Sequence, residues 1–148
     1  MFKKIVVGLD GSETSENALR IACDLSLKYE SELHLVHTPQ PTTVAFAMGA
    51  VAGYHAATTM PSAAEVKQAG EKILNSGSEI VEELGKAVAN AHLGAGDPAD
   101  NIVEYAKTCG ADLIVTGRRG LGTVSALVLG STTQSINHNA ECACLSVV

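Results

Sequence analysis

The residues best suited to chemistry in this chain are glycines and a serine near its C-terminal end. Gly117-Arg118-Arg119-Gly120 follows the apolar run 112–116, and Gly130-Ser131 comes after nine further residues, at a predicted helix start. Glycine lets an anion approach the backbone, and the unpaired N–H groups at a helix N-terminus point toward it. Arginine matches the planar geometry of phosphate. This pattern indicates a phosphate-binding loop.

Two better-known phosphate motifs do not fit this stretch. A Walker P-loop needs Gly-Lys-Ser/Thr, which the sequence lacks. The dinucleotide fingerprint has one residue between its first two glycines, whereas two residues separate Gly117 from Gly120. Gly-x-x-Gly alone also fits a plain turn before a helix. The preceding apolar run and the downstream Gly130-Ser131 favour nucleotide binding over that alternative.

The composition fits a single α/β domain covering residues 1–148. Apolar residues make up 46% of the chain and aromatic residues 3%, so the core must be aliphatic and rich in alanine. The formal net charge of −6 argues against a nucleic-acid-binding surface. The overall field will not attract an anion, so a phosphate site must rely on local donors.

The N-terminal residues 1–10 do not resemble a secretory signal, because their apolar run is short and ends at Asp10. A cytoplasmic location is therefore expected. No histidine or second cysteine pair at ligand spacing completes a metal site. The cysteines are accordingly expected to be buried free thiols; they are Cys23, Cys109, Cys142 and Cys144.

Apolar runs alternate with helical patterns along the chain. Strands are predicted at residues 5–9, 32–37, 89–93, 113–116 and 142–148, and helices between them. This order is typical of a doubly wound, Rossmann-like α/β fold with a five-stranded parallel sheet. Ligands of such sheets bind at the carboxyl ends of the strands, where the strand order reverses. Asp10, His37-Thr38 and Gly117 follow predicted strands and are expected to converge there.

Local signals mark the helix starts. Ser12 can cap the first helix, and Asp97-Pro98 predicts the start of another. The stretches 62–65 and 131–134 both match a capping box, in which the leading serine caps the helix. Gly70 and Gly77 interrupt the apolar stripe of the long helix after residue 62, and close packing against a neighbour would explain them.

The segment Pro39–Ala64 departs from this rhythm because it contains no charged residue. Its glycines, threonines and His55 argue against a membrane span. We expect a long, flexible connection between the second strand and the next helix. The alternative is a flap over the ligand or a contact between subunits, since exposed apolar stretches usually touch something.

The stretch Val6–Ser12, the alternating architecture and the spacing Gly-x2-Gly-x9-Gly-Ser together resemble the universal stress protein family. The resemblance covers nearly the whole chain and is to the branch of the family that binds ATP. It implies a cytoplasmic homodimer associated with stress survival. The family dimer pairs the last strands, which here would be Cys142 to Val148.

The resemblance also implies residue roles. Asp10 would contact the nucleotide sugar or an associated Mg²⁺ or Mn²⁺ ion, and the backbone of Thr38 would meet the adenine edge. Gly117 and Gly120 would let the phosphates approach. Gly130, Ser131 and Thr132 would supply amide and hydroxyl donors. The complete ATP-binding set that the resemblance implies is Gly8, Leu9, Asp10, Thr38, Thr116, Gly117, Arg118, Arg119, Gly120, Gly130, Ser131 and Thr132.

Each of these side chains also has a plainer interpretation. Asp10 could stabilise the turn before the first helix, and Arg118 and Arg119 could be solvent-exposed loop charges. His37 could flank the adenine or lie in the core with its polar atoms satisfied. The other four histidines show no ligand or catalytic spacing.

Three functions remain open on the sequence. The leading one is an ATP-binding regulatory stress-response protein in which the nucleotide acts as a conformational ligand. The second is a slow ATP hydrolase, although no base near the γ-phosphate can be identified. The third is a scaffold that binds no nucleotide and contacts other proteins through Pro39–Ala64.

Overall fold

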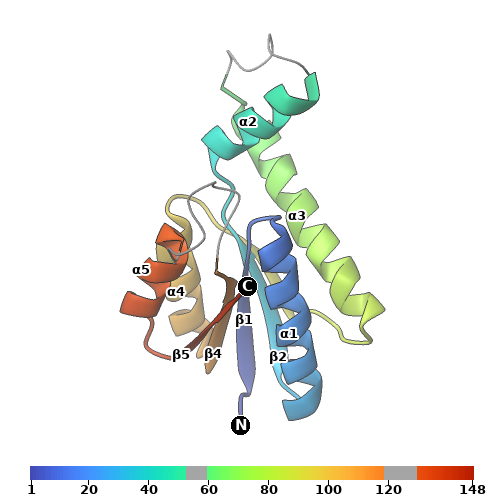
Figure 1. The fold of residues 1–148 in the computed structure, drawn as a ribbon, viewed down its shortest axis with the longest axis vertical. Helices are drawn as coiled ribbons and strands as arrows, with labels where there is room; N and C mark the ends of the chain where they lie inside the picture. Colours follow the sequence, from blue (N-terminus) through green and yellow to red (C-terminus); the bar gives the residue numbers. More distant parts are fainter. Residues whose placement is uncertain (53–59, 119–129) are drawn as a thin grey trace.

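The computed structural model describes residues 1–52, 60–118 and 130–148, so Arg119 and Gly120 of the predicted loop lie outside the described residues. Strands and helices alternate along the chain, as predicted (Figure 1). In chain order the elements are β1 (Lys4–Leu9), α1 (Glu13–Tyr29), β2 (Glu32–His37), α2 (Pro41–Ala52), α3 (Ala63–Glu83), β3 (Asn90–Leu93), α4 (Pro98–Cys109), β4 (Leu113–Gly117), α5 (Ser131–Asn139) and β5 (Ala143–Val147).

The five strands form one parallel sheet in the order β3-β2-β1-β4-β5. The chain builds outward from β1 to β2 and β3, then returns to place β4 on the other side of β1. The strand order therefore reverses between β1 and β4. This confirms the predicted doubly wound, five-stranded parallel sheet and puts the expected ligand crevice at the carboxyl ends of these two strands.

Helices cover both faces of the sheet. One core lies under α1 and α3 and contains the alternate strand residues Ile5, Val7 and Leu9. The other lies under α4 and α5 and contains Val6 and Ile114. Burial on both faces explains why the central strands are continuous apolar runs.

The predicted helix starts are largely confirmed. The Ser12 side chain accepts a hydrogen bond from the Ser15 N–H and caps α1. Ser62 forms the complete capping box of α3, and Asp97 caps α4 with Pro98 in its first turn. These caps satisfy N–H groups that have no partner within their own helix.

The glycines of α3 mark close packing, as expected. A Cβ on Gly70 would lie 2.5 Å from Leu93 Cδ1, and one on Gly77 would lie 2.7 Å from Leu9 Cδ1. The absence of side chains therefore lets α3 approach the sheet.

The uncharged segment Pro39–Ala64 differs from the expected connection, because its residues 41–52 form helix α2. Pro41 stands at the helix start, where its missing N–H costs nothing, and alanine favours the helix that follows. Figure 1 shows α2 beyond the carboxyl ends of the strands, beside the start of α3. Throughout the described parts of the chain, no helix combines the length and apolar character needed to cross a bilayer.

The cysteines are free thiols, but only one of the four is fully buried. Cys23 lies in the core under α1, whereas the other three are half-buried. The prediction of buried thiols was wrong for these three, because the short edge strand β5 and the end of α4 leave their side chains partly uncovered. Burial raises the pKa of Cys109, Cys142 and Cys144, so these thiols stay protonated at neutral pH.

Candidate functional site

The strand register brings the predicted residues to one edge of the sheet. Leu9 pairs with His37 on β2, and Gly8 pairs with Thr116 on β4. Thr38, Asp10 and Arg118 therefore lie at the carboxyl ends of the adjacent strands β2, β1 and β4, in that order across the sheet. They are 28 and more residues apart in sequence, and the parallel pairing alone gathers them.

Asp10 belongs to a hydrogen-bonded turn at the start of α1. Its Oδ1 accepts from both the backbone N–H (2.9 Å) and the hydroxyl (2.5 Å) of Ser12. The Asp10 N–H in turn contacts Ser15 Oγ at 3.4 Å. Among the described residues Oδ2 of Asp10 has no hydrogen-bond partner. Asp10 thus stabilises the turn with one oxygen, and the other can accept a ligand hydroxyl.

Gly117 packs against the backbone of α1. A Cβ on Gly117 would lie 2.8 Å from the carbonyl carbon of Thr14 and 2.9 Å from the backbone nitrogen of Ser15. The bare side of Gly117 is therefore filled by α1, and this glycine joins β4 to the helix start. A close approach of phosphate to Gly117 would have to use its remaining backbone atoms.

The start of α5 has no side-chain cap. Gly130 is the N-cap residue, and Ser131 is already the first helical residue. The capping box predicted at 131–134 is therefore wrong, because it is displaced by one residue from the actual cap. Among the four helices whose N-caps are described, α1, α3 and α4 each have a side-chain cap and α5 has none, so the amides at the α5 start are available to another acceptor.

Backbone and side-chain bonds hold α5 against β4. Arg118 donates to the carbonyl of Val147 and accepts from the N–H of Gly130 at 3.0 Å. The buried Thr133 hydroxyl donates to the carbonyl of Gly117 at 2.8 Å. The two ends of the glycine-rich loop, at residues 118 and 130, are thus fastened beside each other, although residues 119–129 lie outside the described residues.

Three members of the predicted set are buried in the sheet. Leu9 and Thr116 are 7% exposed, and a Cβ on Gly8 would lie 2.7 Å from Ile102 Cδ1. Gly8 lets Ile102 of α4 approach β1, whereas Leu9 packs under α3 on the other face of the sheet. Of the predicted donors, Ser131 is exposed at the start of α5 and Thr132 is half-buried beside it.

His37 is a core histidine. Its side chain is buried, and its Nδ1–H donates to the carbonyl of Leu9 at 2.7 Å. Burial lowers the pKa of His37, an effect that the Leu9 hydrogen bond and the charge of Asp10 only partly oppose. His37 is therefore neutral near pH 7 and ties β2 to β1, which settles the choice that the sequence left open.

Thr38 presents an unusual feature at the same edge. Its Oγ1 is buried and, within the described residues, has no hydrogen-bond partner. A Cβ on Gly94 would lie 2.6 Å from this oxygen and 2.7 Å from Oδ1 of Asn101. Sequence reasoning missed Gly94, Asn101 and also Thr133, because their contacts join distant parts of the chain.

The described residues do not supply a metal-binding cluster. No group of three His, Cys, Asp or Glu side chains gathers within residues 1–52, 60–118 and 130–148 to hold a metal ion. At the crevice Asp10 is the carboxylate that could join phosphate oxygens in holding Mg²⁺ or Mn²⁺.

A surface hollow borders one of the predicted site residues. One hollow of about 370 Å³ lies along the exposed face of α5, and Ser131 is the predicted residue that borders it. Its remaining lining residues are Gln134, Ser135, His138 and Asn139.

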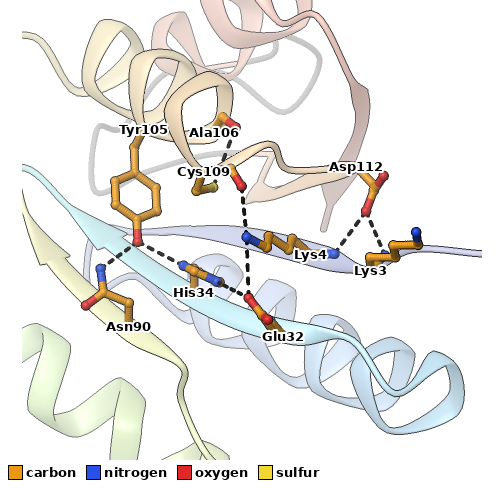
Figure 2. Close-up of polar contacts among 9 residues, drawn as sticks. All are labelled: Lys3, Lys4, Glu32, His34, Asn90, Tyr105, Ala106, Cys109 and Asp112. Carbon is orange, nitrogen blue, oxygen red and sulfur yellow. Dashed lines mark hydrogen bonds and ion pairs between the residues drawn. The ribbon is translucent and has the colours of Figure 1, made fainter.

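A second polar cluster lies at the opposite, amino end of the sheet (Figure 2). Asn90 Nδ2 donates to the Tyr105 hydroxyl at 2.6 Å, so that hydroxyl can donate its own proton to His34 Nδ1, 2.8 Å away. His34 Nε2 then donates to Glu32, which also pairs with Lys4. Every member of this cluster is occupied by another, so it serves to hold α4 against β2.

Comparisons with known proteins agree with this architecture. A family model described as the universal stress protein family matches residues 1–147. Universal stress protein YxiE of Bacillus subtilis (strain 168) is 31% identical over 150 residues, which cover 99% of this chain and 99% of the relative.

Solved structures share the fold. The crystal structure of a universal stress protein in complex with cAMP has a TM-score of 0.72 and 23% identity, covering 99% of this chain and 97% of that one. The universal stress protein from Archaeoglobus fulgidus in complex with dAMP has a TM-score of 0.71 and 21% identity, covering 99% and 98%. Since the family model and the Bacillus relative both span nearly the whole sequence, the chain belongs to the universal stress protein family.

Proposed function

We propose that this protein is an adenine-nucleotide-binding regulator of the stress response, with ATP as its ligand. The observation that carries the proposal is the uncapped start of α5, which lies beside β4 at the point where the strand order reverses. Its amides and the Ser131 hydroxyl are suited to phosphate. Asp10 stands one strand away, where a carboxylate oxygen can accept ribose hydroxyls.

The solved relatives support the choice of an adenine nucleotide. One carries cAMP and another dAMP, and both molecules contain adenine, a pentose and one phosphate. The site in this chain provides groups for each part in the same order, with Thr38 after β2, Asp10 after β1 and Gly130-Ser131 after β4. Additional phosphates would extend toward the loop after Arg118.

The nucleotide acts here as a conformational ligand. Its phosphates would bind the start of α5 while its sugar binds the turn before α1, so one ligand connects two elements of the crevice. A ligand shifts a conformational equilibrium only by its differential affinity for the two states. A divalent cation would accompany the phosphates, with Asp10 as the protein's carboxylate ligand and Arg118 and Arg119 as further neutralising charges.

Thermal unfolding with ATP, ADP, AMP and GTP, together with mass spectrometry of nucleotide retained on purification, tests the proposal. A ligand present at about 100 times its Kd stabilises the folded state by about 2.7 kcal/mol. For a chain of this size that raises Tm by roughly 5–10 °C. If millimolar adenine nucleotide produces no shift, the protein is instead a scaffold that binds no nucleotide.

The same preparation separates binding from hydrolysis. ATP turnover that Asp10→Ala and Ser131→Ala abolish, while ATP binding persists, would make the protein a hydrolase. We expect ATP to be bound and released many times without being hydrolysed, because no described side chain at the crevice is placed as a base for an attacking water.

We further propose a cytoplasmic homodimer that pairs through β5. This strand bonds to β4 along one edge, and its Leu145 is 36% exposed. An edge strand presents unpaired N–H and C=O groups that a second copy can complete. Sedimentation should report a dimer for the wild type and a monomer for Leu145→Lys, with Leu27→Lys, at an exposed leucine of α1, as the matched control.

A further inference from the structure

Two of the half-buried thiols lie on one side of the chain at the start of β5. Cys142 directly precedes the strand, and Cys144 is its second residue. Both pack against the core under α4 and α5, whereas Ala143 between them is exposed. The Cys144 S–H donates to the Cys142 carbonyl at 3.7 Å, so its sulfur leans back along the chain toward Cys142. The pair lies at the amino end of the parallel sheet, away from the proposed nucleotide crevice.

The spacing of the two cysteines disfavours a disulfide but suits a bridging ion. Residues two apart in an extended strand have Cα atoms about 6.7 Å apart, which is the upper limit for an unstrained disulfide. An ion bound between two sulfurs holds them roughly 4.6 Å apart, twice a metal–sulfur bond of about 2.3 Å. Both residues are free thiols. Their side chains can therefore reach a common ion by rotation, without a shift of the strand.

A cavity beside Cys142 gives a route to the pair. It has a volume of about 190 Å³, and Ala111 and Ile114 are among the apolar residues that line it. Lys107 and Glu141 also line the cavity and form an exposed ion pair, so the cavity opens to solvent there. An apolar shell around a metal site limits the access of water to the ion. The surroundings of Cys142 thus combine an entry path with a wall of low polarity.

We propose that Cys142 and Cys144 bind one Cu(I) ion between their sulfurs. Soft thiolate ligands select Cu(I), zinc and iron–sulfur clusters. Zinc and iron–sulfur sites use three or four protein ligands, and no group of three ligating side chains gathers within residues 1–52, 60–118 and 130–148. Cu(I) is the member of this set that two sulfurs satisfy. As the ion binds, each thiol gives its proton to solvent and the copper stays monovalent.

This site is compatible with the other functions proposed for the chain. Pairing of two copies through β5 would use the backbone N–H and C=O groups at the strand edge, whereas the two sulfurs project from the face of the sheet. Copper at the amino end of the sheet also leaves Asp10 and the start of α5 untouched. The inference therefore does not depend on nucleotide binding or on dimerisation.

Anaerobic titration of the reduced full chain with Cu(I), in competition with a chromogenic Cu(I) chelator, tests the inference. The wild type should take one ion per chain from the chelator and gain thiolate-to-copper absorption in the ultraviolet. Cys142→Ser and Cys144→Ser should each lower the affinity at least about a hundredfold, because losing a ligand costs more than the roughly 10–100-fold typical of losing a supporting group. Cys109→Ser, at a third half-buried thiol of the same core, is the matched control and should keep wild-type affinity.

A measurement on the wild type alone covers the case in which a variant fails to fold. Bound Cu(I) should protect Cys142 and Cys144, but not Cys109, from alkylation, and mass spectrometry of the digested chain reports each site separately. Equal alkylation of Cys142 and Cys144 with and without Cu(I) would overturn the inference.

The titration has further outcomes that would overturn it. The wild type could leave Cu(I) with the chelator, or Cys142→Ser or Cys144→Ser could bind the ion as tightly as the wild type. A loss in Cys109→Ser as large as in the other two variants would replace the pair with a site of three thiols. Zn²⁺ bound as tightly as Cu(I) would likewise contradict a site of two sulfurs.

Discussion

Gly117 at the end of β4 lies directly against the backbone of Thr14 in the first turn of α1. A Cβ at this glycine would approach the Thr14 carbonyl carbon to 2.8 Å, nearer than nonbonded atoms tolerate. Through this contact β4 packs directly against α1, the helix that follows β1. A glycine that the sequence marks as a phosphate contact therefore also sets the distance between the two sides of the crevice.

Gly117→Ala should destabilise the protein by about 1–3 kcal/mol, because backbone atoms of α1 cannot move aside as a flexible side chain can. Urea unfolding measures the loss. Gly85→Asn is the matched control, since a Cβ at Gly85 meets nothing within 4 Å and asparagine tolerates its φ of +80°. Equal stability of Gly117→Ala and wild type would show that α1 does not pack against β4 as described.

The missing cap of α5 makes a prediction in which stability and binding move in opposite directions. Gly130→Asp would cap the helix and favour its N-terminus with a negative charge, raising stability by roughly 0.5 kcal/mol. The same carboxylate would repel phosphate and occupy the free amides, so the Tm shift with ATP should disappear. Thermal unfolding with and without ATP measures both.

Gly130→Asn is the matched variant, because it has the same shape and capping ability without the charge. It should keep part of the ATP response. If Gly130→Asp keeps the full response, the phosphates do not bind at the start of α5.

His37 predicts a dependence of stability on pH. Burial lowers its pKa in the folded state below the ordinary value, so the unfolded chain binds this proton more readily. The stability linked to His37 is therefore complete above about pH 6.5 and is lost as the pH falls toward the folded-state pKa.

His37→Asn should reduce this dependence, because its amide can donate to the Leu9 carbonyl without titrating. Urea midpoints from about pH 7 to about pH 5 measure the difference between variant and wild type. If the urea midpoints of the two proteins change with pH in the same way, groups other than His37 cause the loss of stability in acid.

The polar cluster at the amino end of the sheet predicts a purely structural effect. Tyr105→Phe removes the hydroxyl between His34 and Asn90, leaving the buried His34 Nδ1 without its partner. The expected loss is about 1–3 kcal/mol of unfolding free energy, with nucleotide binding unchanged. Tyr29→Phe is the control, since the Tyr29 ring packs against Phe2 and its hydroxyl has no partner among the described residues. A change in ATP affinity for Tyr105→Phe would contradict the separation of the two ends of the sheet.

Interactions between near neighbours in the chain could be predicted from the sequence. The alternation of strands and helices and the caps at Ser12, Ser62 and Asp97 appear as expected. Each depends on periodicity or on a bond that spans a few residues. The glycines of α3 marked close packing in the sequence, but their partners, Leu93 and Leu9, came only from the tertiary structure. The parallel order of the strands then followed from the alternation, because parallel neighbours require a crossover between them.

Only the tertiary structure decided which backbone and polar side-chain atoms remain accessible or unpaired once the elements pack. The filled side of Gly117, the neutral role of His37 and the unpaired hydroxyl of Thr38 all depend on contacts with residues far away in the chain. The cap of α5 shifted by one residue because Gly130 is held by the Arg118 carbonyl across the loop, which no local pattern encodes. Sequence patterns report bonds within an element, whereas free donors and acceptors at a site emerge only when separate elements meet.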